Sequence, residues 1–169
     1  MRSYTQLGLT AILLPVLLIG CGGVDVTGPS DPQGAPPLDA SEGVVAVQTS
    51  RGRAAAELLA GPAEIAPGGQ VIVRVANRGD LQLAYGRPIR VERWDGSAWI
   101  ETEDSRQAAW TMELILLGPQ QVGVEQRWPF SSGQTPRSGW YRFTKHVHVE
   151  GTTNEAERFT VMARVRVTP

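Results

Sequence analysis

Residues 158–167 read Arg-Phe-Thr-Val-Met-Ala-Arg-Val-Arg-Val, and they alternate between two sets of side chains. One set is apolar, and the other contains three arginines: Phe159, Val161, Ala163, Val165 and Val167 against Arg158, Thr160, Met162, Arg164 and Arg166. Because successive side chains of a strand point to opposite faces, the segment predicts a β-strand with one buried face. Residues 70–77 have the same period, with three valines on one face and Arg74 on the other.

Further strand-like segments lie between these two, at residues 87–94, 98–103, 110–117, 122–130 and 140–149. Turn signals separate them at residues 77–80, 95–96, 118–119 and 131–139. About seven strands, spaced by roughly 10 to 15 residues without a helical period, predict an all-β antiparallel β-sandwich. The expected inward side chains are Trp110, Met112, Leu114, Leu116, Val122, Val124, Trp128, Tyr141, Phe143 and Val147.

Several turn and core motifs follow one another in a fixed order along the chain. They are Pro67-Gly68, Asn77-Arg78-Gly79-Asp80, Tyr85-Gly86, Glu92-Arg93-Trp94, Trp99, and Gly139-Trp140-Tyr141-Arg142-Phe143 with Lys145. This order resembles the bacterial immunoglobulin-like domains of envelope proteins and lipoproteins, over roughly residues 64–167. The chain departs from that pattern at Gly118-Pro119, where the family usually reads Pro-Gly. The resemblance implies an immunoglobulin-like sandwich, in which Tyr141 corresponds to the tyrosine corner, and it implies no reaction.

The N-terminus carries the signature of export with lipid attachment. Residues 7–19 contain no charge and follow a start with one cation, Arg2. As a helix, about 13 residues rise roughly 20 Å, which is too short for the ~30 Å hydrocarbon core of a membrane. The tetrad Leu18-Ile19-Gly20-Cys21 resembles a lipobox, in which the cysteine receives a diacylglyceryl group. We therefore expect a signal peptide over residues 1–20 and a lipidated Cys21, which would hold the protein on a membrane of the bacterial cell envelope.

A tether is expected to join Cys21 to the domain. Residues 22–43 are rich in glycine and proline and poor in large apolar side chains, so burial cannot offset their conformational entropy. The expected organisation is a tether over residues 21–52 and the sandwich over residues 53–169. Residues 44–48 fit either a first strand or the end of the tether. Residues 53–60 are ambiguous, because their alanines favour helix but the stretch is short and ends at Gly61-Pro62.

The composition excludes some classes of partner. The chain has 16 lysines and arginines against 17 acidic residues, without the clustered cations that bind phosphates, so no nucleic-acid partner is expected. Its single cysteine cannot form a disulfide within the chain. The expected partners are the membrane, through Cys21, and an envelope protein or a glycan.

One hairpin is a candidate binding surface. Asp95-Gly96 suits a two-residue turn, which would place Trp94 opposite Ser97 and leave Trp94 and Trp99 diagonally on one face with Arg90. Residues 89, 91, 98 and 100 would then point inward. Paired exposed tryptophans beside an arginine have the composition of an interaction hot spot. The alternatives are a three-residue turn that flips the parity and buries one tryptophan, or a pair that only covers the sheet edge.

A second cluster, His146, His148 and Glu150, lies on one face of a predicted strand and has the donor types of a zinc site. The alternative is an outward polar face, and the chain has no third histidine. Lys145 falls on the inward face, where we expect it to extend its ammonium to water at the sheet end, the alternative being a perturbed lysine in a cleft. No nucleophile elbow accompanies either histidine, so no catalytic residue and no cofactor are expected.

The predicted function is a non-catalytic, membrane-anchored binding or accessory module. One alternative is a small metal-dependent or hydrolytic envelope enzyme centred on His146 and His148. A further alternative is a structural spacer. The sequence leaves open the identity of the partner, the membrane in which Cys21 resides, the oligomeric state and the order of the strands.

Overall fold

The structure, a computed structural model, describes residues 34–130 and 137–169. Cys21, the predicted signal peptide and the first part of the predicted tether lie outside the described residues. The described chain is built from strands, with one short helix, α1 (Glu103–Gln107), and one 3-10 turn, η1 (Glu155–Glu157). No helix within the described ranges is both long enough and apolar enough to cross a membrane.

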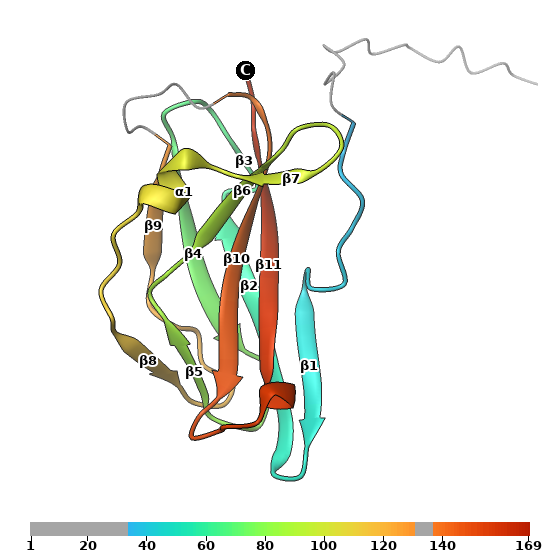
Figure 1. Cartoon of the computed structure of the whole chain (residues 1–169), viewed down its shortest axis with the longest axis vertical. Coiled ribbons are helices and arrows are strands. Elements are labelled where there is room, and N and C mark those ends of the chain that lie inside the picture. The colour runs from blue at the N-terminus through green and yellow to red at the C-terminus, as the bar shows by residue number, and fades with distance from the viewer. Residues whose placement is uncertain (1–33, 131–136) are drawn as a thin grey trace, which may run out of the picture. The chain divides into compact units, whose positions relative to one another are not determined.

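The strands form two sheets (Figure 1). The first sheet is antiparallel throughout, in the order β1 (Val44–Thr49), β2 (Gly52–Gly61), β4 (Gln70–Asn77) and β9 (Gln126–Pro129). The second sheet has the order β3 (Glu64–Ile65), β11 (Arg158–Val167), β10 (Gly139–Val149), β5 (Leu83–Gly86) and β8 (Leu114–Leu117). The strand β6 (Arg90–Trp94) joins this sheet by pairing with β10, and β7 (Trp99–Glu101) joins it by pairing with β6. The predicted all-β sandwich is confirmed, with more strands than expected, of which β6, β7, β8 and β9 are shorter than their predicted segments.

The long strand β10 has two consecutive partners along one edge. Its first half pairs with β6 and its second half pairs with β5. The two partners are separated by residues 87–89, where Pro88 has no N–H to donate to a ladder. The edge of β10 is therefore covered by two short strands with a break between them.

The core lies between the two sheets and follows the predicted alternation in most strands. Val161, Val165 and Val167 of β11 are buried, as are Val71, Val73 and Val75 of β4. In the same core lie Trp128, Tyr141, Phe143 and Val147, so these four inward assignments are confirmed. The hydroxyl of Tyr141 donates to the carbonyl oxygen of Arg137 at 2.9 Å, which is the contact expected of a tyrosine corner.

The predicted inward faces of residues 112–116 and 122–124 are wrong. Met112, Leu114, Leu116, Val122 and Val124 are exposed. The pairing of β8 with β5 explains the error in residues 114–116. Leu117 lies opposite Leu83 and Ile115 opposite Tyr85, so the odd residues share the inward face of β5. Leu114 and Leu116 therefore point to the outside of the sheet.

The folded domain begins earlier than residue 53. Residues 44–49 form β1, which pairs with β2 along its whole length, and so they are a strand rather than the end of a tether. Before β1, the chain also contacts β11: the N–H of Met162 donates to the carbonyl oxygen of Ser41 at 2.8 Å. The expected tether boundary is therefore too late.

The ambiguous segment 53–60 is part of strand β2, and a close contact with its backbone requires a glycine at residue 79. A Cβ on Gly79 would lie 2.5 Å from the backbone nitrogen of Ala55, so the turn after β4 rests directly on the β2 backbone. The buried Asn77 holds this turn, because its amide donates to the carbonyl oxygens of Leu81 and Leu117 and accepts from the N–H of Gly79. The predicted turn at residues 77–80 is thus a packed corner.

Candidate binding surface on the β6–β7 hairpin

The hairpin between β6 and β7 has a four-residue loop instead of the expected two-residue turn. Trp94 pairs with Trp99, and the N–H of Asp95 donates to the carbonyl oxygen of Ala98 at 3.0 Å. The side chain of Asp95 accepts from the N–H groups of Ala98 and Ser97, each at 2.8 Å. These hydrogen bonds, with Ala98 first, hold the pKa of the Asp95 carboxyl below its usual range. The predicted diagonal register is therefore wrong.

The observed register brings the two tryptophans closer together than the predicted diagonal arrangement would. Trp94 and Trp99 lie directly opposite each other, with ring centroids 5.4 Å apart and ring planes inclined by 60°. Val91 of β6 and its partner on β10, Phe143, are buried on the inner face of the sheet. Trp94 points to the opposite side from Val91, so the tryptophan pair lies on the outer face. Both indoles are half-buried, and the guanidinium of Arg142 covers the ring of Trp99 at 4.7 Å. Both tryptophans therefore lie on the outer face, but they are half-buried rather than exposed as predicted.

Two of the four residues expected to point inward are exposed. Ile89 and Val91 are buried, but Ala98 and Ile100 are exposed. Ala98 belongs to the loop, and Ile100 lies opposite Arg93 beyond the end of the core, with 53% of its surface exposed. The shift of register explains the exposure of Ala98, since it moves residue 98 out of the ladder, whereas Ile100 remains paired.

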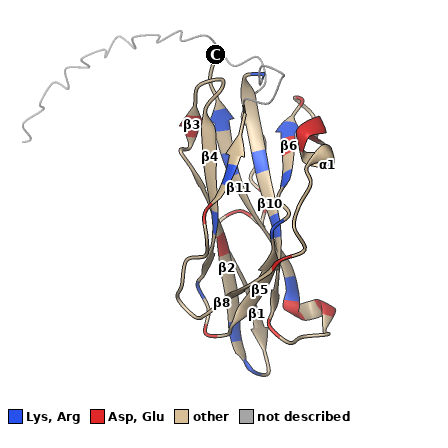
Figure 2. Cartoon of the chain, turned by 90° about the vertical axis from the view of Figure 1, so that its left-hand side faces the viewer, with Lys and Arg blue, Asp and Glu red and all other residues tan. Residues whose placement is uncertain are grey.

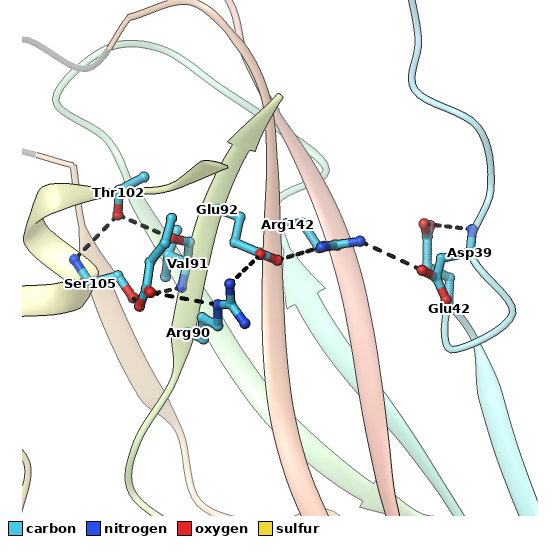
Figure 3. A network of polar contacts seen from close by, with 9 residues as sticks. Asp39, Glu42, Arg90, Val91, Glu92, Thr102, Ser105 and Arg142 are labelled. Carbon is cyan, nitrogen blue, oxygen red and sulfur yellow. Dashed lines mark hydrogen bonds and ion pairs between the residues drawn. The ribbon is translucent and has the colours of Figure 1, made fainter. Parts of the chain in front are cut away.

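Arg90, the third residue predicted for this surface, lies in a network of ion pairs (Figure 3). Its guanidinium is 3.0 Å from Oε1 of Glu92 and 3.7 Å from Oε2 of Glu101. Glu92 is buried and takes a second cation from β10: Arg142 donates to Oε2 through Nε at 2.8 Å and through Nη2 at 2.6 Å. Two bonds from one guanidinium to one carboxylate fix both side chains in position.

The network continues to the segment before β1. Arg142 is 3.6 Å from the carboxylate of Asp39, and the N–H of Asp39 donates to Glu42 at 3.1 Å (Figure 3). Glu42 also pairs with Arg164 of β11 at 2.5 Å. Figure 2 shows lysine or arginine on β6, β10 and β11, the strands that this network crosses or borders. The arginines therefore join the hairpin, two central strands and the start of the domain.

A short helix supports the hairpin from its other end. The Thr102 side chain accepts from the N–H of Ser105 and caps α1. The buried hydroxyl of Ser105 accepts from the N–H of Val91 and donates to Glu101, both at 2.9 Å. The position of α1 thus fixes the orientation of β6 and β7.

The histidine cluster is not assembled into a metal site among the described residues. His146 is exposed and its Nδ1 lies 3.1 Å from the hydroxyl of Thr160, while Glu150 follows the end of β10 and its N–H donates to Gln82. In the described ranges, no group of three or more histidine, cysteine, aspartate or glutamate side chains could hold an ion. The structure therefore adds no support to the metal alternative.

Lys145 is buried instead of reaching water at the sheet end. Its ammonium donates to the carbonyl oxygens of Gly86 and Arg87, at 2.6 and 2.9 Å, in the break between β5 and β6. It also lies 5.3 Å from the ring centre of Tyr85. Burial, and secondarily the charge of Arg87, lower the pKa of Lys145 to about 7. The inward face was predicted correctly, but the environment was not.

Sequence reasoning missed the buried pair of Glu92 and Arg142. The alternation of side chains along the strands indicated the shared face, because Arg90, Glu92 and Arg142 all fall on outward positions. The pairing of β6 with β10, however, could not be read from the sequence, and only that pairing places Glu92 opposite Arg142.

The two-sheet arrangement and the tyrosine corner define an immunoglobulin-like sandwich. A comparison with protein families matches residues 62–163 to the bacterial Ig-like domain. This match covers more than half of the chain, and the protein belongs to that family. A search of curated proteins found no match to the chain.

Proposed function

We propose that this protein is a bacterial envelope lipoprotein that presents its Ig-like domain as a non-catalytic binding module. Two features support the proposal. The lipobox-like tetrad ending in Cys21 supports attachment to a membrane. The outward pair of Trp94 and Trp99 supports recognition of a partner, and it is the observation on which the binding role depends.

The tryptophan pair favours a protein partner over a glycan. Trp94 and Trp99 are inclined by 60°, so they do not form the flat platform on which a sugar ring stacks. Arg90 lies on the same face, and tryptophan with arginine is the composition of protein interaction hot spots. The surrounding ion pairs hold these side chains before binding, which lowers the entropy lost when a partner docks.

Attachment to the membrane is tested by Cys21→Ser. We expect the variant to incorporate no fatty acid and to stay with the uncleaved signal peptide, because the thiol is the only acceptor for the lipid. Metabolic labelling with a radioactive or clickable fatty acid measures this directly. Labelling of the variant as strong as that of the wild type would contradict lipidation at Cys21.

Binding is tested with the double variant Trp94→Ala, Trp99→Ala in the full chain. We expect it to remain folded and to lose the partner that the wild type retains in crosslinked membrane pull-downs, identified by mass spectrometry. Leu114→Ser is a matched control, because Leu114 is an exposed apolar residue on β8, away from the hairpin. Retention of the same partner by a folded double variant, or equal loss in the control, would contradict a binding role for the hairpin.

A further inference from the structure

The edge of strand β2 is covered along only part of its length. β1 pairs with residues 52–57 of β2 and reaches no further, because its first residue, Val44, lies opposite Glu57. Among the described residues, no strand pairs with residues 58–61 on the side away from β4. Figure 1 shows β2 running on beyond the level at which β1 begins. One end of β2 is therefore an open sheet edge.

Gly43 is the point at which the chain leaves this edge. Its φ is +82°, a left-handed conformation that residues with a Cβ rarely adopt. Immediately before it, the chain contacts the other sheet, where the N–H of Met162 donates to the carbonyl oxygen of Ser41 at 2.8 Å. The segment before β1 is thus held on β11 and does not continue the ladder along residues 58–61.

The main chain of Leu58 and Ala60 faces the open edge. The carbonyl oxygens of Arg53 and Ala55 accept from the turn that follows β4, so they face the β4 side. Successive residues of a strand direct their N–H and C=O groups to alternate edges, and the register of β2 is unbroken against both β1 and β4. Unpaired N–H and C=O groups along an edge are a template on which a further strand can add.

A groove of about 550 Å³, the edge groove, runs along this part of β2. Its lining includes every residue from 57 to 62. Because consecutive side chains of a strand point to opposite faces, the groove follows the strand edge instead of one face of the sheet. Ile72 and Arg74 of β4 and Ala163 of β11 complete the lining. None of the described residues 34–43 belongs to it, so the segment before β1 leaves it open.

The chemistry of the edge groove suits an uncharged occupant. Ala60 and Ala163 pack against the core but are only half-buried, so an apolar side chain placed beside them would complete their burial. The two charges of the lining are already paired, Glu57 with Arg78 and Arg74 with Glu125. A charged occupant would therefore lose hydration without gaining a counter-ion.

The length of the open edge limits what can bind there. Four strand residues span about 13 Å, and β1 occupies the rest of the same edge. The edge of a second folded sheet would collide with β1, whereas a single extended segment can enter in line with it. A short peptide segment of a partner protein is thus a better fit than a second copy of the domain.

We infer that the edge groove binds an extended, uncharged segment of a partner protein as an added β-strand. The segment lies antiparallel to β2, as β1 does, and pairs its backbone with Leu58 and Ala60. It directs apolar side chains toward Ala60 and Ala163. Trp94 and Trp99 lie on the other sheet, so this site is separate from the proposed binding surface.

The probe is the peptide acetyl-Thr-Val-Ala-Val-Thr-amide, titrated into the purified full chain and followed by backbone amide NMR. We expect saturable shifts at residues 58–61. Two isomers carry N-methyl groups at alternate positions, and the one that blocks the N–H groups facing β2 should bind at least about tenfold more weakly than the other. Equal affinity of the two isomers, no saturation at about 10 mM, or shifts at residues 114–117 instead would overturn the inference.

Two variants locate the binding. Ala60→Pro removes an N–H that faces the groove and none that faces β4, and should weaken binding by about tenfold or more. Leu59→Asp keeps the backbone but places a charge in the lining, with a similar expected loss. The matched control is Leu116→Asp, at an exposed residue of the edge strand β8, which should bind as the wild type does. If Ala60→Pro fails to fold, Leu59→Asp decides, and unchanged affinity in it would overturn the site.

Two further measurements identify the occupant and separate the sites. Dimerisation of the wild type without peptide, abolished by Ala60→Pro, would assign the edge to a second copy and overturn the proposed occupant. The double variant Trp94→Ala, Trp99→Ala should bind the peptide as tightly as the wild type does. Loss of peptide binding in a folded double variant would contradict a separate site, so failure here is distinguishable from failure of the proposed binding surface.

Discussion

Glu92 and Lys145 are both charged and buried in the same sheet, but their surroundings differ. The side chain of Glu92 is 5% exposed and is bound by two arginines. Lys145 is 1% exposed and donates only to backbone carbonyl oxygens, with no carboxylate paired to it among the described residues. Glu92 faces outward, where long arginines of a neighbouring strand reach it. Lys145 faces the core, where only the break at residues 87–89 offers acceptors. The face of the sheet therefore decides whether a buried charge receives a counter-ion.

The largest expected effect comes from removing the partner of Glu92. Arg142→Ala leaves a buried carboxylate with Arg90 alone, and we expect it to lower the free energy of unfolding by about 3 kcal/mol. Urea unfolding followed by fluorescence measures the loss. The control is Arg158→Ala, which removes an exposed pair with Glu155, with side chains 51% and 81% exposed. Its cost should be under about 0.5 kcal/mol. Equal costs would show that burial does not strengthen the dependence of Glu92 on Arg142.

A smaller effect should appear in the pH dependence of stability. The pKa of Lys145 is about 7 in the folded protein, against an ordinary value of 10.5. Between these values the unfolded chain binds a proton that the folded chain does not, so stability rises with pH. The rise from about pH 7 to 9 should be roughly 2 kcal/mol, and below about pH 6 this contribution should be constant.

Urea midpoints between about pH 6 and 9.5 measure this dependence. The upper limit lies below the ordinary tyrosine pKa of about 10, and in the folded protein burial raises the pKa of both Tyr85 and Tyr141. Lys145→Met is the control, and the readout is the slope with pH rather than the absolute stability. A variant with the wild-type slope would show that Lys145 is not the titrating group.

The sequence predicted the fold where polar and apolar residues alternate. In β11, and at Tyr141, Phe143 and Val147 of β10, the period of two identified the buried face, and the turn before β10 identified Tyr141 as a corner residue. In β8 it could not, because Leu114-Ile115-Leu116-Leu117 has no polar residue to mark the outer face. There the face is set only by the pairing with Leu83 and Tyr85.

The candidate site was predicted in part for a similar reason. The face of Arg90, Trp94 and Trp99 follows from parity within one strand and its hairpin. The register does not, because Asp95 can begin either a two-residue turn or the observed loop, in which its side chain accepts from Ser97 and Ala98. The edge groove is lined by β2 and β11, which belong to different sheets. No sequence pattern within one strand predicts a contact between two sheets.

The ion pairs from Asp39 to Arg90 also have a mechanical meaning. Asp39 lies where the chain enters the domain, and Trp99 lies on the hairpin at the other end of the network. A pull between the two loads these contacts in series, so the weakest yields first. That contact is the 3.6 Å pair of Asp39 with Arg142, since Glu92 is held to Arg142 by two shorter bonds. Peeling the segment before β1 from β11 then requires the loss of the Glu42–Arg164 ion pair and of the hydrogen bond from Met162 to Ser41, so these two contacts hold the start of the domain under tension.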